Sequence, residues 1–198
     1  MIAESERFSP LPPGTVPMGL GLAASGIASY AFLALSARAL GPEAFAPLSV
    51  LWATLFVAGP GLFQPVEQEL SRSVAARVAG GTGFALLLRR SVVLTAGLYG
   101  VAVAVAVVAS PFIVEDLFGG QWSLWVALVL GVGGYAVSHV VRGYLAATQR
   151  FGRYAVWFVA DGATKTLPGV VLAVLAVTTT GWYAAVLAIA AYVGAAAA

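Results

Sequence analysis

The sequence has no cysteine, a single histidine and little charge, since only 9% of its residues are Asp, Glu, Lys or Arg. Without cysteine there is no disulfide framework, no thiolate metal site and no cysteine nucleophile. One histidine and few carboxylates leave little for acid–base or metal chemistry. No serine lies in a G-x-S-x-G motif, and no GK[ST] follows the glycine-rich stretches GPGLFQ and GGTG. We therefore expect no enzymatic activity, no cofactor and no metal site.

Apolar residues take the place of the missing charge, with 61% hydrophobic residues and a mean hydropathy of +0.95. Soluble domains carry about 25% charged residues, so the composition predicts an integral membrane protein. The basic residues lie at the ends of apolar runs and form no continuous cationic stripe, which argues against nucleic-acid binding. Arginine outnumbers lysine, and Ala, Val and Gly are abundant. This composition is typical of a GC-rich genome, so we expect the plasma (inner) membrane of a bacterium.

The N-terminal residues differ from the rest of the chain. The stretch SPLPPGTVP contains four prolines, which cannot continue a helix. Residues 1–15 are therefore predicted to form a cytoplasmic tail. The rival interpretation is a cleaved secretory signal. Its n-region would carry Glu4, Glu6 and Arg7, and the apolar run that follows is longer than the roughly 7–15 residues of an h-region.

Six apolar runs predict an all-α, polytopic membrane bundle of about six transmembrane helices. The expected spans are about 16–37, 44–63, 91–113, 122–147, 154–177 and 182–198. At 1.5 Å per helical residue each can cross a hydrocarbon core of about 30 Å, the last at the short limit. Small residues on several faces of the first run predict close helix packing and a central position in the bundle. These residues are Gly19, Gly21, Ala24, Ser25, Gly26, Ala28 and Ser29.

The arginines predict the orientation of these spans, because positive charge is retained on the cytoplasmic side during insertion. The longest polar interval, residues 64–90, carries four arginines close to the apolar runs on either side. With this interval inside, eight of the ten basic residues are cytoplasmic. They are Arg7, Arg72, Arg77, Arg89, Arg90, Arg142, Arg150 and Arg153. Both chain termini are then predicted to lie in the cytoplasm.

Two features of the second span and the interval after it are informative. Val66, Leu70, Val74 and Val78 recur every four residues, which predicts either a short helix along the inner membrane surface or a solvated linker helix. Before it, the Gly59-Pro60-Gly61 stretch favours a kink or unwinding, because proline removes a backbone hydrogen bond. Such a break is either a hinge or an ordinary helix end.

Asp161 and Lys165 lie within one expected span, where each charge costs about 2.5–3.5 kcal/mol on insertion scales. At i and i+4 they share a helix face, with the acid first, which favours pairing. They either form an internal ion pair that fixes this helix in the bundle, or line a hydrated cavity and meet a charged substrate. Arg142 is close enough to a helix end to reach the cytoplasmic interface. His139 is interpreted as a hydrogen-bonded residue of the bundle in preference to a proton relay.

Three stretches together resemble a known family. AR-LGPE-F after the first span, P-EQE-SR-AA after the second, and VRGYLAATQRFGRYAVWFVADGATK are similar to the polysaccharide (O-antigen) flippases of the multidrug/oligosaccharidyl-lipid/polysaccharide superfamily. The resemblance covers about residues 19–176. It implies one of two lobes of about six helices that surround a central cavity with alternating access. The partners implied are membrane lipid, a lipid-linked glycan and a second lobe or partner chain.

In that family, cationic cavity residues are thought to hold the pyrophosphate of a lipid-linked oligosaccharide. The resemblance therefore implies an exporter or flippase, or its N-terminal half, with no cofactor. The candidates for anion contact are Arg38, Arg142 and Lys165, with Asp161 as the partner of Lys165. The candidates for an inner gate or hinge are Gly59, Pro60, Gly61, Gln64, Glu67 and Arg72.

Two alternatives from other functional classes stay open. A drug/cation antiporter of the same superfamily would use Asp161 as a protonatable cation site. A non-transporting membrane scaffold or truncated fragment would need neither Asp161 nor Lys165. The resemblance is to the first lobe alone, so the chain is truncated, pairs with a second lobe, or does not transport.

Overall fold

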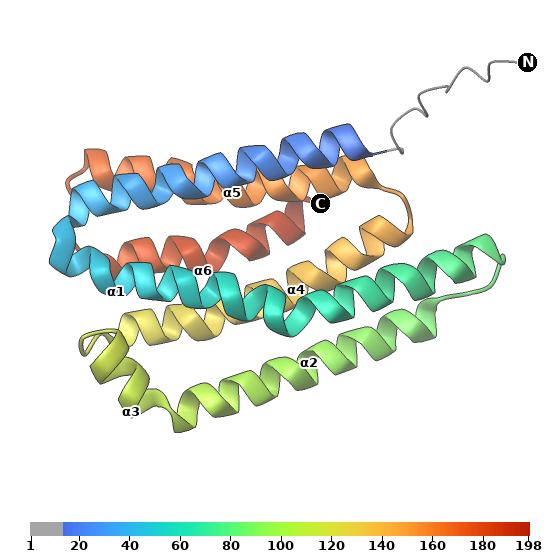
Figure 1. Cartoon of the computed structure of the whole chain (residues 1–198), viewed down its shortest axis with the longest axis horizontal. Helices are drawn as coiled ribbons and strands as arrows, with labels where there is room; N and C mark the ends of the chain where they lie inside the picture. The colour runs from blue at the N-terminus through green and yellow to red at the C-terminus, as the bar shows by residue number, and fades with distance from the viewer. Residues whose placement is uncertain (1–13) are drawn as a thin grey trace, which may run out of the picture.

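A computed structural model describes residues 14–198, and all regular structure in this range is helical (Figure 1). The predicted all-α class is therefore confirmed. The predicted cytoplasmic tail, apart from its last two residues, lies outside the described residues. The helices are α1 (Thr15–Ala79), α2 (Ala85–Val108), α3 (Ser110–Phe112), the π-helical turn η1 (Ile113–Leu117), α4 (Trp122–Ala147), α5 (Phe151–Val174) and α6 (Thr180–Ala197).

Helix α1 consists of two arms that meet at Gly41. Gly41 has φ 74° and ψ 171°, and it is the residue with non-helical dihedrals inside α1. Glycine adopts such a positive φ without the steric cost that a Cβ would bring. Pro42 follows and starts the next helical stretch, as the Gly-Pro pair predicts. The first arm (residues 15–40) and the second arm (residues 42–79) thus run in opposite directions from the turn at Gly41 (Figure 1).

The second arm is longer than the sequence pattern predicts. It neither ends nor unwinds at Gly59-Pro60-Gly61, and residues 64–79 continue the same helix up to Ala79. The expectations of an unwinding or a helix end at residues 59–61 and of a separate helix within residues 64–90 are therefore wrong. The reason is a buried stripe that crosses both positions at a spacing of three or four residues. It consists of Leu48, Leu51, Leu55, Gly59, Phe63, Val66, Leu70 and Val74. The alternative of a kink agrees with the bend of the second arm about halfway along its length (Figure 1).

Packing along this stripe offsets the hydrogen bonds lost at Pro60 and Pro65. Tyr135 of α4 lies directly against Gly59, where a Cβ would come within 2.6 Å of its ring. The stripe stops at Val74, because Val78 is half exposed. Gly80 and Gly81 then begin the short connection to α2.

Helix α4 is the centre of the bundle, with thirteen buried residues and contacts to α1, α2, α5 and α6. The first arm, expected to be central, has only four buried residues and lies along α5 at one edge (Figure 1). That expectation is wrong because small residues mark close pairwise contact and do not require a helix to be surrounded.

The contact between the first arm and α5 is close for the reason predicted. A Cβ at Gly21 would lie 3.2 Å from the Ala155 carbonyl oxygen. A Cβ at Gly162 would lie 2.9 Å from the Ala28 Cβ and 3.3 Å from the Ser25 Cα. The small residues therefore allow the two backbones to approach, as in membrane helix pairs.

Four helices, α1, α2, α4 and α6, are long and apolar enough to cross a membrane. Helix α2 has a single buried residue, Thr95, and presents valines such as Val93 and Val108 outward. An apolar surface of this extent is typical of a lipid-facing protein. The structure thus supports association with a membrane.

We expect Gly162→Ala to lower the free energy of unfolding by about 1–3 kcal/mol, because the added methyl overpacks the contact with Ala28. Gly97→Ala in α2 is the matched control, since nothing lies within 4 Å of a Cβ there. Thermal unfolding in detergent, followed by tryptophan fluorescence, measures both. Equal melting temperatures for the two variants would contradict the close packing described above.

Candidate functional site

A cavity of about 640 Å³ lies between the two arms of α1, α4 and α5. One part of its wall is polar, with Ser25, Ser29, Gln64, Glu67, Gln68, His139, Arg142, Asp161 and Lys165. Another part is aromatic, with Tyr30, Trp52, Phe56, Tyr135, Tyr154, Trp157 and Phe158. A second cavity, of about 360 Å³ between α1, α2 and α4, has an almost wholly apolar lining. The larger cavity is therefore the candidate site.

Asp161 and Lys165 form a buried ion pair on the cavity wall. The Lys165 Nζ lies 2.6 Å from Asp161 Oδ2, and the side chains are 9% and 5% exposed. The Ser25 hydroxyl of the first arm lies 3.5 Å from the same carboxylate oxygen. Pairing reduces the cost of removing both charges from water. Asp161 is the hydrogen-bond acceptor that Lys165 has among the described residues, so two N–H donors remain for water or a ligand.

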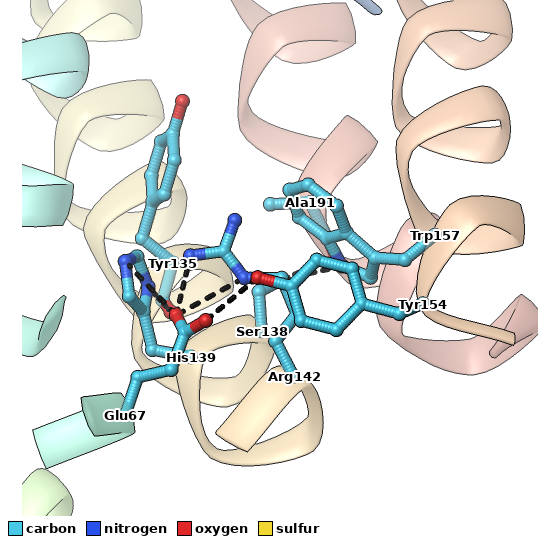
Figure 2. A network of polar contacts seen from close by, with 8 residues as sticks. All are labelled: Glu67, Tyr135, Ser138, His139, Arg142, Tyr154, Trp157 and Ala191. Atoms are coloured by element: carbon cyan, nitrogen blue, oxygen red, sulfur yellow. Dashed lines mark hydrogen bonds and ion pairs between the residues drawn. The ribbon is translucent and has the colours of Figure 1, made fainter. Parts of the chain in front are cut away.

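A second cluster centres on the carboxylate of Glu67, from the second arm (Figure 2). Arg142 of α4 donates to Glu67 Oε2 from Nη2 at 2.6 Å and from Nε at 3.2 Å. Tyr154 of α5 donates to Glu67 Oε1 at 2.7 Å. One carboxylate therefore joins three helical segments, and its bonds to a cation are of the stronger, charge-assisted kind.

The Arg142 guanidinium is held in place by an aromatic side chain as well as by Glu67. It lies 4.6 Å from the centre of the Trp157 ring, a cation–π distance. The Trp157 indole N–H donates to Ser138 at 3.2 Å, and the Ser138 hydroxyl donates to the Ala191 carbonyl of α6 at 2.8 Å (Figure 2). This series of contacts connects the cavity wall to the far side of the bundle.

His139 lies one turn before Arg142 and is almost fully buried. Its Nδ1 is 2.7 Å from the Tyr135 carbonyl oxygen, which confirms the interpretation of a hydrogen-bonded bundle residue. Its Nε2 has no hydrogen-bond partner among residues 14–198 and lies 3.8 Å from Glu67 Oε2. Figure 2 shows the ring directed toward the Glu67 carboxylate.

The structure brings Pro60, Gln64, Glu67, Arg142, Asp161 and Lys165 of the predicted set to one cavity. Arg142 turns inward to Glu67 and does not extend to the cytoplasmic interface as expected. The reason is that Glu67 and Trp157 together provide the guanidinium with a charged and an aromatic partner.

Arg38, Arg72, Gly59 and Gly61 are not cavity residues. Arg38 is exposed at the Gly41 end of the first arm, and Arg72 is exposed and paired with Glu69 at 2.7 Å. Gly59 is buried under Tyr135, and a Cβ at Gly61 would have nothing within 4 Å. Arg72 follows the cavity residues Gln64 and Gln68 at the next four-residue interval, so it lies one turn beyond the cavity on the same face of α1. The proposed anion contact of Arg38 and the gate role of Arg72 therefore have no geometric support.

Sequence reasoning missed the aromatic residues of the site, although the signal was present. Tyr154, Trp157, Asp161 and Lys165 follow one another at intervals of three, four and four residues, which places them on one face of α5. Extending the face of the charged pair by two turns toward the N-terminus would have identified Tyr154 and Trp157.

The cavity lining combines charged and aromatic side chains. Among the described residues no three His, Asp or Glu side chains gather in a group that could hold a metal ion. The cavity presents two cations, two carboxylates and a broad aromatic wall. Such a lining suits a ligand with both charged and apolar parts.

Comparisons with known proteins give similarity without a function. No family model matches the chain, and no solved structure matches it. The chain is similar to uncharacterized proteins of Mycobacterium bovis and of two strains of Mycobacterium tuberculosis, at 26% identity over 155 residues in each case. The match covers 76% of this chain and 35% of each relative. The chain thus spans about a third of the length of the curated relatives it matches.

Proposed function

We propose that the chain is a multi-pass lobe of six crossings in a bacterial plasma membrane, with both termini in the cytoplasm. The apolar faces of α1, α2, α4 and α6 support the membrane location. The arginines at the α1–α2 and α4–α5 connections support the orientation, because both connections lie at the same end of the bundle (Figure 1). The similarity to mycobacterial proteins supports a bacterial setting.

We further propose that the lobe belongs to an exporter or flippase that moves a lipid-linked oligosaccharide or polysaccharide precursor. The observation that carries this proposal is the cavity that holds Arg142 and Lys165 beside an aromatic wall. Buried charges in a membrane protein are costly and usually line a substrate path. The two cations match the charge of a lipid diphosphate, and the aromatic residues match the faces of sugar rings and the apolar lipid.

The ion pairs make such binding reversible. In the unliganded state, Asp161 neutralises Lys165 and Glu67 neutralises Arg142. A phosphate oxygen that replaces one of these carboxylates keeps the cation paired but leaves the buried carboxylate without its cation, at a cost of about 3–5 kcal/mol, so the net gain from binding is small. A cavity of this kind binds an anion without retaining it, which transport requires.

A second lobe completes the cavity in this proposal. The cavity is lined by exposed apolar side chains, among them Leu22, Tyr30 and Phe56. About two thirds of each mycobacterial relative lies outside the match, which leaves room for a second lobe in those proteins. For this chain the second lobe is further sequence, a second copy or a partner chain.

A drug/cation antiporter is the second candidate, and one observation favours it. Asp161 lies on the cavity wall with the Ser25 hydroxyl beside it, opposite aromatic rings that attract organic cations. In this alternative Asp161 exchanges Lys165 for the cationic substrate. The two candidates differ in which member of the ion pair contacts the substrate.

The orientation is tested with single cysteines, because the sequence contains none. We expect Thr178→Cys, in the α5–α6 connection, to react with a membrane-impermeant maleimide on intact cells. Thr82→Cys, in the α1–α2 connection, should react only after the cells are opened. Both threonines are exposed, so access depends on sidedness. Labelling of Thr82→Cys in intact cells would refute the proposed topology.

The flippase function is tested on the buried ion pair. We expect Lys165→Ala to reduce export of the lipid-linked glycan about tenfold or more, because the anion loses a cationic contact. The double variant Asp161→Asn/Lys165→Gln should lose export while keeping normal membrane levels, since it leaves no unpaired charge. Arg153→Ala is the matched control, as Arg153 is a basic, exposed residue of the same helix outside the cavity.

The same variants separate the alternatives. If Lys165→Ala retains export and Asp161→Asn loses cation efflux, the result would support the antiporter and contradict the flippase. Full activity of all variants in both assays would identify a non-transporting scaffold. Membrane levels measured by immunoblot show whether a loss of export reflects a loss of protein.

A further inference from the structure

One hydrogen bond determines which nitrogen of the neutral His139 ring carries the proton. Its Nδ1 lies 2.7 Å from the backbone carbonyl oxygen of Tyr135. A carbonyl oxygen only accepts hydrogen bonds, so Nδ1 must carry a proton in every state that keeps this bond. The neutral imidazole is therefore the Nδ1–H tautomer, and its Nε2 is an acceptor.

That acceptor faces another acceptor. The Nε2 of His139 lies 3.8 Å from Glu67 Oε2, and no donor within the described residues reaches it. The histidine is 1% exposed, so the unmet hydrogen-bonding capacity is buried. A buried polar atom without a partner is unusual in a native protein and often marks a functional group. Adding one proton turns Nε2 into a donor and the contact into an ion pair.

We propose that His139 and Glu67 form a proton-binding site whose occupation frees Arg142 to bind an anion in the cavity. This inference rests on the proposed function, because it assigns the regulation of the same cavity. Both hydrogen bonds from Arg142 go to Glu67 Oε2, the oxygen that faces His139. A protonated His139 competes for this oxygen, and Arg142 remains on the Trp157 ring at the cavity wall.

The groups around His139 from each helix are consistent with this competition. From α1, Glu67 is the charged residue that faces it, and Phe63 packs with its ring 6.0 Å away. From α4, the charged neighbour is Arg142, and from α5 the phenol of Tyr154 binds the other Glu67 oxygen. From α6, the Ala191 carbonyl is bonded to Ser138, the residue before His139, and the α2 residues Leu87 and Leu88 pack on the apolar cluster of Leu70, Val74 and Ala147.

The charge of the cavity then changes with one proton. The four charged residues Glu67, Arg142, Asp161 and Lys165 sum to zero when His139 is neutral. Protonation leaves one net positive charge, which favours an anion. By thermodynamic linkage, a bound anion must in turn favour the protonated histidine to the same extent. Proton uptake and anion binding are coupled through Glu67.

Protonation of His139 can be followed directly by NMR, because His139 is the sole histidine of the sequence. Protein labelled with ¹⁵N-histidine and purified in detergent gives one imidazole signal, recorded between about pH 3 and pH 8 because burial favours the neutral ring. We expect the Nδ1–H tautomer at high pH and a titration that moves to lower pH by about 1 unit in Glu67→Gln. Glu69→Gln, an exposed acid of the same helix, is the matched control and should leave the titration unchanged.

The coupling is measured with sulfate, an anion that keeps its charge over this range. We expect sulfate to bind about tenfold more tightly at the acidic end than at the neutral end, and saturating sulfate to move the His139 titration to higher pH. In His139→Gln, the affinity for sulfate should not depend on pH. Calorimetry in detergent measures the binding, and tryptophan fluorescence confirms that each variant is folded.

The outcomes separate this proposal from the function on which it rests. Two results would overturn the proton site alone. One is sulfate binding of equal affinity at all pH values, and the other is a His139 titration that is the same in Glu67→Gln as in the wild type. Absence of sulfate binding at every pH would overturn the anion cavity and the coupling together. Binding that strengthens with acid in the wild type and in Glu69→Gln, but not in His139→Gln, establishes the coupling.

Discussion

The carboxylate of Glu67 is the interaction on which the cavity depends. It accepts hydrogen bonds from Arg142 of α4 and Tyr154 of α5, and it is itself carried by the second arm of α1. These three segments form most of the cavity wall, so this one group links them to one another. Because the carboxylate is largely buried, its bonds act at low dielectric and are stronger than surface pairs. The continuous second arm is needed to place Glu67 there.

Close backbone packing supplies the frame around this group. A Cβ at Gly143 of α4 would lie 2.9 Å from the Glu67 carbonyl oxygen, so the helices that carry Glu67 and Arg142 touch beside their ion pair. A short helix separation lets the Arg142 side chain reach Glu67 and still lie over Trp157. The glycine and the ion pair therefore act together, since a larger residue at Gly143 would separate the two charges.

Local features could be read from the sequence, and long-range ones could not. The turn at Gly41-Pro42, the bounds of α4 and the pairing of Asp161 with Lys165 depend on neighbours within a few residues. The continuity of α1 through Pro60 depends on packing against Tyr135, about 75 positions away in the chain. The pairing of Glu67 with Arg142 also depends on a contact between residues distant in sequence, because 75 residues separate them and no spacing rule connects them.

The masking of both cations by carboxylates bears on how a carrier works. A permanently cationic cavity would hold a diphosphate by strong charge-assisted bonds and release it slowly. In the proposed anion cavity, each bond to an anion replaces a bond to Asp161 or Glu67. The net gain is therefore the difference between two similar interactions, less the cost of the carboxylate left unpaired. Affinity then depends on small changes at Glu67, and the group best placed to cause them is the buried, unpartnered Nε2 of His139. In the proposed carrier, binding strength and release are thus set by the competition for one carboxylate oxygen.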